Sequence, residues 1–175
     1  MPLASDFSMY KEEIELIRSQ NRVECDLYSI IACIIRESKN GSKISLRDVS
    51  IRRTTDFSKS FKGNSGFPDF VIRTREKCEY ASILGAVEVK YTDEDLKMEQ
   101  HLEQLNGHRE FYKKVIYTNG LKWQFYMPEE LKENSNDPWE WETNLGAIVN
   151  GEVIWNREDK WVELLENLDK IEWFK

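Results

Sequence analysis

The sequence predicts an α/β domain built around a mixed central sheet. Apolar residues recur at helical spacing over residues 10–37, and short runs rich in valine and isoleucine follow. A second helical segment then separates these runs from two more apolar runs near residues 115–126. This order of helix, strands, helix and strands is typical of an α/β or α+β core with a mixed sheet.

Length and composition indicate one folded domain. The 175 residues are 40% hydrophobic and 33% charged, which excludes a disordered or membrane-embedded chain. No apolar run approaches the roughly 20 residues of a membrane span, and residues 1–6 lack the features of a secretion signal. Cys25 and Cys33 lie eight apart on one predicted helix, which suits small buried residues better than a disulfide framework. We therefore expect a cytoplasmic protein that does not contact membranes.

In the first half of the chain, the spacing of apolar residues predicts one broken helix and one strand or hairpin. The helix is expected over Tyr10–Glu37, with a break at Ser19-Gln20-Asn21 and an end at Asn40-Gly41. Partial alternation of apolar residues over Ile44–Thr55 favours a strand or hairpin. The composition of Phe61–Gly66 predicts a loop.

In the middle of the chain, apolar runs, a capping threonine and a turn motif predict two strands, a helix and a hairpin. The strands are expected at Asp69–Arg75 and Tyr80–Tyr91. The helix is expected to begin in Thr92–Asp95, where a threonine N-cap precedes acidic residues, and to reach Tyr112. Its buried face would carry Met98, Leu102, Leu105 and Tyr112, with Leu96 pointing elsewhere. Two further strands, at Val115–Tyr117 and Leu121–Tyr126, flank an Asn119-Gly120 turn.

After residue 127 the sequence becomes polar and rich in turn-forming residues. We therefore divide the chain into a core, residues 1–127, and an extension, residues 128–175, that packs on this core. The extension is expected to contain a polar linker at Lys132–Pro138, a hairpin within Ala147–Trp155 and a helix at Lys160–Ile171. Five of its residues are tryptophans, which we expect to pack a small subdomain.

Charge is distributed unevenly along the chain. The net charge is −7, yet residues 129–175 carry 13 acidic and 5 basic residues, while residues 36–77 carry 11 basic and 5 acidic ones. Local potential rather than net charge steers a polyanion. The expected phosphate contacts are five basic residues of this segment: Arg47, Arg52, Arg53, Lys59 and Lys62. The acidic extension suits a protein partner or a homodimer interface.

Two short motifs on the neighbouring predicted strands carry the chemistry. Pro68-Asp69 opens one apolar run, and Glu88-Val89-Lys90 lies within the next. In a strand, Glu88 and Lys90 share one face while Val89 points into the core. The carboxylates of Asp69 and Glu88, with the backbone carbonyl of Val89, form a hard oxygen set that suits Mg²⁺ or Mn²⁺. Lys90 would orient or deprotonate the attacking water, or stabilise the phosphorane charge.

These motifs resemble the PD-(D/E)XK nuclease superfamily, which has the restriction-endonuclease-like fold. Gly66–Val71 and Gly85–Lys90 carry the resemblance, and Ile116–Trp123 looks like the strand-turn-strand of nuclease domains in type I restriction motor subunits. The resemblance implies an αβββαβ core with a mixed central sheet, here followed by a C-terminal hairpin and helix. It covers about residues 10–127.

The resemblance also implies roles for individual residues. Asp69 and Glu88 would bind the metal, Lys90 would be catalytic, and Glu24 and Gln104 would be supporting members of the catalytic set. Asp26 lies near Glu24 and is an alternative to it. Relatives with this glutamine often have a tyrosine four residues later, whereas this chain has His108 there, with Tyr112 one turn further along. Either residue could fill that position.

The expected function is metal-dependent hydrolysis of phosphodiester bonds, with DNA favoured as the substrate. One alternative is a nuclease-fold module that binds nucleic acid or a protein without cutting it. Another is an RNA endonuclease, which would use the same catalytic residues. A zinc site built from His101, His108 and the three cysteines is not expected, because no pair has ligand spacing.

Overall fold

A computed structural model describes residues 6–51, 56–132 and 137–175 of the chain. Its six-stranded mixed sheet has the order β1-β2-β3-β4-β5-β6, and a separate two-stranded sheet pairs β7 with β8. The elements in chain order are α1 (Phe7–Gln20), η2 (Glu24–Asp26), α2 (Leu27–Glu37), η3 (Gly41–Lys43), β1 (Ile44–Asp48), α3 (Asp56–Lys59), β2 (Phe70–Thr74), β3 (Ile83–Val89), α4 (Glu99–Tyr112), β4 (Val115–Thr118), β5 (Lys122–Tyr126), η4 (Glu129–Leu131), β6 (Trp141–Asn144), β7 (Gly146–Val149), β8 (Glu152–Trp155) and α5 (Glu158–Lys170).

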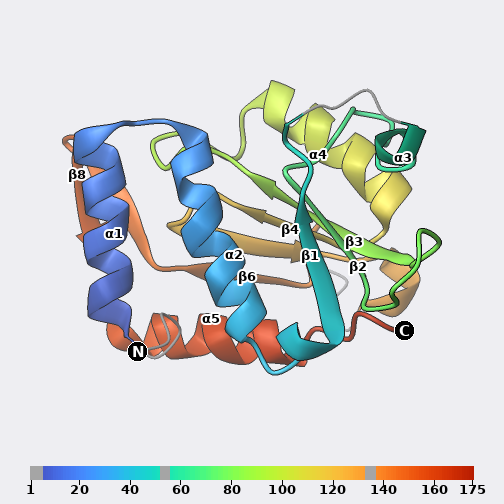
Figure 1. Ribbon diagram of the computed structural model, residues 1–175. Coiled ribbons are helices and arrows are strands. Elements are labelled where there is room, and N and C mark those ends of the chain that lie inside the picture. The colour runs from blue at the N-terminus through green and yellow to red at the C-terminus, as the bar shows by residue number, and fades with distance from the viewer. Residues whose placement is uncertain (1–5, 52–55, 133–136) are drawn as a thin grey trace.

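The predicted αβββαβ core is confirmed. It consists of α2, three antiparallel strands β1–β3, the crossover helix α4, and β4, which runs parallel to β3. The remaining pairs, β4 with β5 and β5 with β6, are antiparallel. Figure 1 shows α2 in front of the sheet, α1 beside α2 at the left, and α5 along the bottom of the view.

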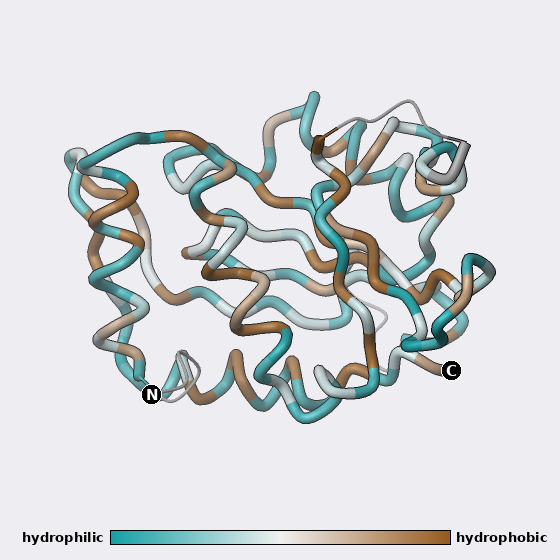
Figure 2. The backbone as a smooth tube through the Cα atoms, viewed as in Figure 1, coloured by the Kyte–Doolittle hydropathy of each residue, from teal (hydrophilic) through white to brown (hydrophobic). Residues whose placement is uncertain are grey.

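Helices cover both faces of the sheet, because strand side chains alternate between two hydrophobic clusters. Phe70 and Ile72 of β2 pack in the cluster that contains residues of α1, α2 and α5. Val71 of the same strand packs with Leu105 and Tyr112 of α4. Hydrophobic and hydrophilic segments alternate along α1, α2 and α5 in Figure 2, as helices buried on one side require.

The C-terminal part of the chain belongs to the same core. β6 adds a sixth strand beside β5, and Trp161, Leu164 and Leu168 of α5 are buried in the larger cluster. Phe7 of α1 stacks on Trp161 with 5.3 Å between the ring centroids, and the tilted Tyr10 ring lies 4.7 Å from the same tryptophan. The division at residue 127 stays a prediction, but removing residues 128–175 would expose core side chains.

The helix predicted to begin in Thr92–Asp95 begins later, at Glu99. Side chains from the sheet bind the carbonyls of the preceding segment. Asn119 Nδ2 donates to the carbonyls of Thr92 and Glu94 at 3.2 and 3.1 Å, and Tyr117 Oη donates to that of Leu96 at 3.3 Å. These bonds hold the segment against the sheet and take acceptors that a helix would use.

The buried face predicted for this helix is partly wrong. Leu105 and Tyr112 are buried, but Met98 and Leu102 are exposed. Leu96, expected to point elsewhere, is buried with the residues of α4. The expected burial of the cysteines is also wrong, because Cys25 is exposed and Cys33 is half-buried. Within the part of the chain that the structure describes, no helix has both the length and the apolar character of a membrane span.

Candidate active site

The strand register brings Asp69 and Glu88 to opposite positions. Antiparallel pairing joins Phe70 to Val87, and the same register continued by one residue places Asp69 across from Glu88. Directly opposed residues have Cβ atoms about 4.5–5.5 Å apart. The Val89 N–H donates to Asp69 Oδ2 at 2.7 Å and fixes this carboxylate beside β3. The two predicted acids therefore face one another across neighbouring strands.

Asp69, Glu88 and Lys90 share the face of the sheet that α4 covers. The paired residues Val71 and Ala86 both pack in the α4 cluster, and the three site residues lie an even number of positions from them. Asp69, Glu88 and Lys90 are 9%, 2% and 6% exposed, respectively. Charged groups this deeply buried need partners, and each of them has at least one.

Lys90 joins β3 to α4. Its Nζ donates to Glu88 Oε1 at 2.7 Å and to Gln104 Oε1 at 2.9 Å. Burial is the largest single effect and lowers the pKa of Lys90, but the charge and hydrogen bond of Glu88, with the charges of Glu24 and Asp69, together raise it. Lys90 thus stays a cation that two acceptors hold in place, with one ammonium hydrogen left over.

Tyr28 of α2 connects Glu24 to Asp69 and was missed in the sequence. Its hydroxyl lies 3.0 Å from Glu24 Oε1 and within a short hydrogen-bond distance of Asp69 Oδ1. A hydroxyl has one proton, so both contacts are hydrogen bonds only when one of the two carboxyl groups is protonated. Tyr28 follows Glu24 by four residues, a spacing that places two helical side chains together and could have indicated this role.

Burial and repulsion favour protonation of the carboxyl groups. Burial, followed by the nearby negative charge of Glu88, raises the pKa of Asp69 to about 7. Burial also raises the pKa of the half-buried Glu24 carboxyl. Asp26, the alternative to Glu24, accepts a hydrogen bond from Asn21 Nδ2 at 2.6 Å, and its side chain forms no hydrogen bond within the described network of Tyr28, Asp69, Glu88, Lys90 and Gln104.

His108, rather than Tyr112, reaches the site from α4. Its Nε2 lies 3.2 Å from Glu88 Oε2, and the ring is fully buried. The two atoms are not aligned for a hydrogen bond, so Glu88 Oε2 and both imidazole nitrogens have no hydrogen-bond partner among the described residues. The Tyr112 hydroxyl instead donates to the carbonyl of Phe61.

The chemistry of this donor set suits a divalent cation. Three carboxylates surround one ammonium group, and Glu88 Oε2 is a buried acceptor with no donor among the described residues. Hard oxygen ligands of this kind are those that Mg²⁺ and Mn²⁺ prefer. Over residues 6–51, 56–132 and 137–175, however, no three His, Cys, Asp or Glu side chains already converge as a complete ligand set. An ion here would therefore need side-chain adjustment or further ligands.

Three of the five predicted phosphate-binding residues can be placed. Arg47, Lys59 and Lys62 are all exposed. Arg47 lies opposite Val71 in the β1–β2 register, and the Val49 N–H donates to the carbonyl of Asp69, so the end of β1 runs beside the site. Arg52 and Arg53 lie outside the described residues.

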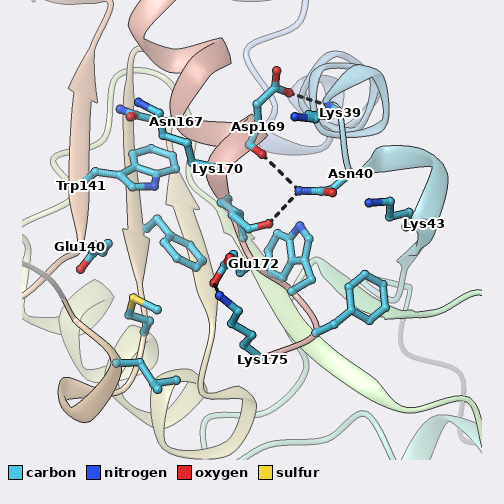
Figure 3. Close-up of a pocket in the computed structure, with 16 residues that line it drawn as sticks. Lys39, Asn40, Lys43, Glu140, Trp141, Asn167, Asp169, Lys170, Glu172 and Lys175 are labelled. Carbon is cyan, nitrogen blue, oxygen red and sulfur yellow. Dashed lines mark hydrogen bonds and ion pairs between the residues drawn. The ribbon is translucent and has the colours of Figure 1, made fainter.

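A large cavity lies at the other end of α2, away from this network. It has a volume of about 940 Å³ and is lined by the segment after α2, by β5 and β6, and by the C-terminal residues. Asn40 Nδ2 bonds the carbonyls of Asp169 and Ile171 there, as Figure 3 shows. These bonds tie the chain after α2 to the end of α5. None of the predicted catalytic residues lines this cavity.

Comparison with solved structures identifies the fold. The chain aligns with a chain of the cryoEM structure of a DrdV–DNA complex, with a TM-score of 0.58 and 14% sequence identity. This protein has a restriction-endonuclease-like α/β fold. The alignment covers 97% of this chain but 14% of the other, so this chain spans about a seventh of that neighbour's length. No family model matches the sequence, and a search of curated proteins finds no match. Membership of the PD-(D/E)XK superfamily stays a prediction.

The raised pKa of Asp69 predicts a pH-dependent stability of the metal-free protein. Because folding raises this pKa from 3.8 to about 7, protonation of Asp69 favours the folded state. The contribution of Asp69 to the free energy of unfolding is therefore complete below pH 4 and is lost as the pH rises to 7. At pH 8 in EDTA, Asp69→Asn should therefore raise the melting temperature by roughly 2–8 °C, since up to a few kcal/mol of cost is removed. At pH 4 the substitution should change little. A larger gain at pH 4 than at pH 8 would contradict this electrostatic account.

Proposed function

We propose that this protein is a metal-dependent nuclease that hydrolyses phosphodiester bonds, with DNA as the favoured substrate. The observation that carries the proposal is the buried arrangement in which Asp69 opposes Glu88 and Lys90 bonds Glu88. A purely structural core gains little from such a set, because removing several ionisable groups from water costs more than apolar packing would. Active sites are where such costs are found.

The residues of the network would have different roles in catalysis. Asp69 and Glu88 would hold Mg²⁺ or Mn²⁺, with the backbone carbonyl of Val89 as the third predicted ligand. A bound ion would polarise a phosphate oxygen and lower the pKa of water. The Val89 N–H and the Tyr28 hydroxyl orient the Asp69 carboxylate. The remaining Lys90 hydrogen is suited to a charged phosphate oxygen.

The choice of DNA rests on two observations. One structural neighbour of this chain is a DNA complex, and exposed Arg47, Lys59 and Lys62 provide basic charge close to Asp69 in the sequence. An RNA endonuclease would use the same catalytic groups. A module that binds without cutting is the second candidate, and it is favoured by the lack of a complete three-ligand set over the described ranges. A protein partner or homodimer at the acidic extension, and the cytoplasmic location, stay predictions.

A cleavage assay separates these functions. Purified protein is incubated with plasmid, single-stranded DNA or RNA of matched length, in Mg²⁺, Mn²⁺ or EDTA. A nuclease cuts one of these substrates with metal and none in EDTA. Binding of DNA without cleavage at any metal concentration would instead support the silent module, and preferential cleavage of RNA would replace DNA as the substrate.

The exposed basic residues that lie close to Asp69 in the sequence should contribute affinity without sequence preference. Replacing Arg47, Lys59 and Lys62 with glutamine should weaken DNA binding equally for unrelated sequences, because interactions with phosphate carry no base information. The slope of log affinity against log salt should decrease by about 0.9 for each duplex phosphate that the variant no longer neutralises. Fluorescence anisotropy with catalytically inactive protein measures both effects.

Lys160→Gln on α5 is a single-charge control, since this half-buried lysine pairs with Glu163 one turn further along the same helix. It should leave the slope unchanged. An equal loss of affinity in the control and in the triple variant would mean that net charge, rather than this surface, governs binding.

A further inference from the structure

We propose that His108 is a direct ligand of the metal, so that the site prefers Mn²⁺ or another imidazole-binding transition metal over Mg²⁺. This inference rests on the proposed function, because it concerns the ion that Asp69 and Glu88 would bind. It adds to the site a nitrogen donor that neither the oxygen set predicted from the strands nor the comparisons assign.

The first argument is the position of the two atoms. Glu88 Oε2 and His108 Nε2 are 3.2 Å apart, yet they do not form a hydrogen bond with each other. Two donor atoms that bind one ion at about 2.1 Å are separated by roughly 3.0–3.4 Å, from octahedral to tetrahedral angles. The observed separation is within this range. Both atoms can therefore converge on a third point instead of on one another.

The second argument is burial without a partner. His108 is 0% exposed, and neither of its ring nitrogens has a hydrogen-bond partner within the described chain. Leaving a buried polar group unsatisfied costs about 1–3 kcal/mol, so a position of this kind calls for an explanation. A metal bond would supply the missing interaction for His108 Nε2 and Glu88 Oε2, while Nδ1 would still have no hydrogen-bond partner among the described residues.

The third argument concerns the alternative ion pair. A protonated His108 beside Glu88 would also be attractive, but Glu88 already has a cationic partner in Lys90 at 2.7 Å. In such a pair the imidazole should also be aligned for a hydrogen bond to the carboxylate, and His108 Nε2 has no hydrogen-bond partner among the described residues. An imidazole nitrogen that binds the metal accounts for both observations.

This ligand set would change metal preference. Mg²⁺ prefers oxygen donors, whereas imidazole suits transition metals, and Mn²⁺ accepts both kinds. Replacing His108 with glutamine should therefore reduce Mn²⁺ affinity about tenfold or more while changing Mg²⁺ affinity less. Calorimetric titration of each ion into metal-free protein measures this difference without any substrate.

Pulsed electron paramagnetic resonance of bound Mn²⁺ tests the ligand directly. The wild-type complex should show nitrogen-14 coupling from an imidazole, and His108→Gln should lose it. His101→Gln is the matched control, because His101 is also buried on α4 but contacts Glu94 at 2.7 Å rather than Glu88. This variant should keep the coupling.

The outcomes separate this inference from the proposed function. Mn²⁺ that binds wild-type protein without nitrogen coupling, or with coupling that only His101→Gln removes, would overturn the role of His108 and leave the nuclease proposal intact. No Mn²⁺ or Mg²⁺ binding to the wild-type protein at millimolar concentration would overturn both. A wild-type spectrum without nitrogen coupling overturns the role of His108 without any variant, and where coupling is present the two glutamine variants assign it.

Discussion

Asp69→Asn is expected to reduce metal-dependent cleavage by about a thousandfold or more. The asparagine keeps the shape of the side chain, and its carbonyl oxygen can still accept the Val89 N–H, so the fold should be retained. It removes one of the two charges that would hold the cation. Metal ions contribute several kcal/mol of transition-state stabilisation, and each 1.36 kcal/mol corresponds to about tenfold in rate. Single-turnover cleavage of a labelled duplex measures the loss.

The matched control is Asp26→Asn at the start of α2. Asp26 is close to Glu24 in sequence but bonds Asn21 instead of the network. We expect this variant to retain most of the wild-type rate. Equal activity in Asp69→Asn and wild-type preparations would mean that the cleavage comes from another site or from a contaminating enzyme.

Lys90→Met is expected to lower the cleavage rate by about 10²–10³-fold, a typical loss for one well-placed electrostatic donor. Methionine occupies the buried space of the lysine stem but provides no hydrogen for a phosphate oxygen. The Glu88 carboxylate would lose its 2.7 Å partner, so metal binding should be retained or become tighter. A low rate at saturating metal is therefore the result that distinguishes Lys90 from a metal ligand.

Lys122→Met provides the comparison for this substitution. Lys122 begins β5 and lies 3.9 Å from Glu142, so it is a partly buried lysine with one acidic neighbour outside the network. Its replacement should leave the rate within a few-fold of wild type. If Lys90→Met behaves in the same way, Lys90 stabilises Glu88 in the folded protein and takes no part in the chemistry.

The sequence was sufficient to predict the core because its periodicities are local and strong. Helical spacing located α1 and α2, and the Asn119-Gly120 turn located the β4–β5 hairpin. β6 was missed because Trp141–Asn144 is short and mostly polar, and its place beside β5 depends on pairing with a distant strand. The late start of α4 was missed for a similar reason, since side chains from β4 and the following turn bind the preceding carbonyls.

The site was predictable in part, because strand alternation places Glu88 and Lys90 on one face. The roles of Asp69, Glu88, Lys90, Gln104 and Glu24 stay predictions, although the structure connects them through hydrogen bonds and close charges. The helical spacing of Glu24 and Tyr28 could have paired these two residues, but the contact of Tyr28 with Asp69 depends on the start of α2 reaching the start of β2. The choice between His108 and Tyr112 required the orientation of α4, which sequence spacing leaves undetermined.

Anomalous diffraction from crystals grown with Mn²⁺ tests the central claim most directly. We predict an anomalous peak at the end of the β2–β3 pair where β2 begins and β3 ends. It should lie within about 2.0–2.6 Å of an oxygen of Asp69 and an oxygen of Glu88. Asp69→Asn crystals under the same conditions should lack this peak. A wild-type structure with fully ordered Asp69 and Glu88 side chains and no peak between them at saturating Mn²⁺ would contradict the metal-dependent nuclease proposal.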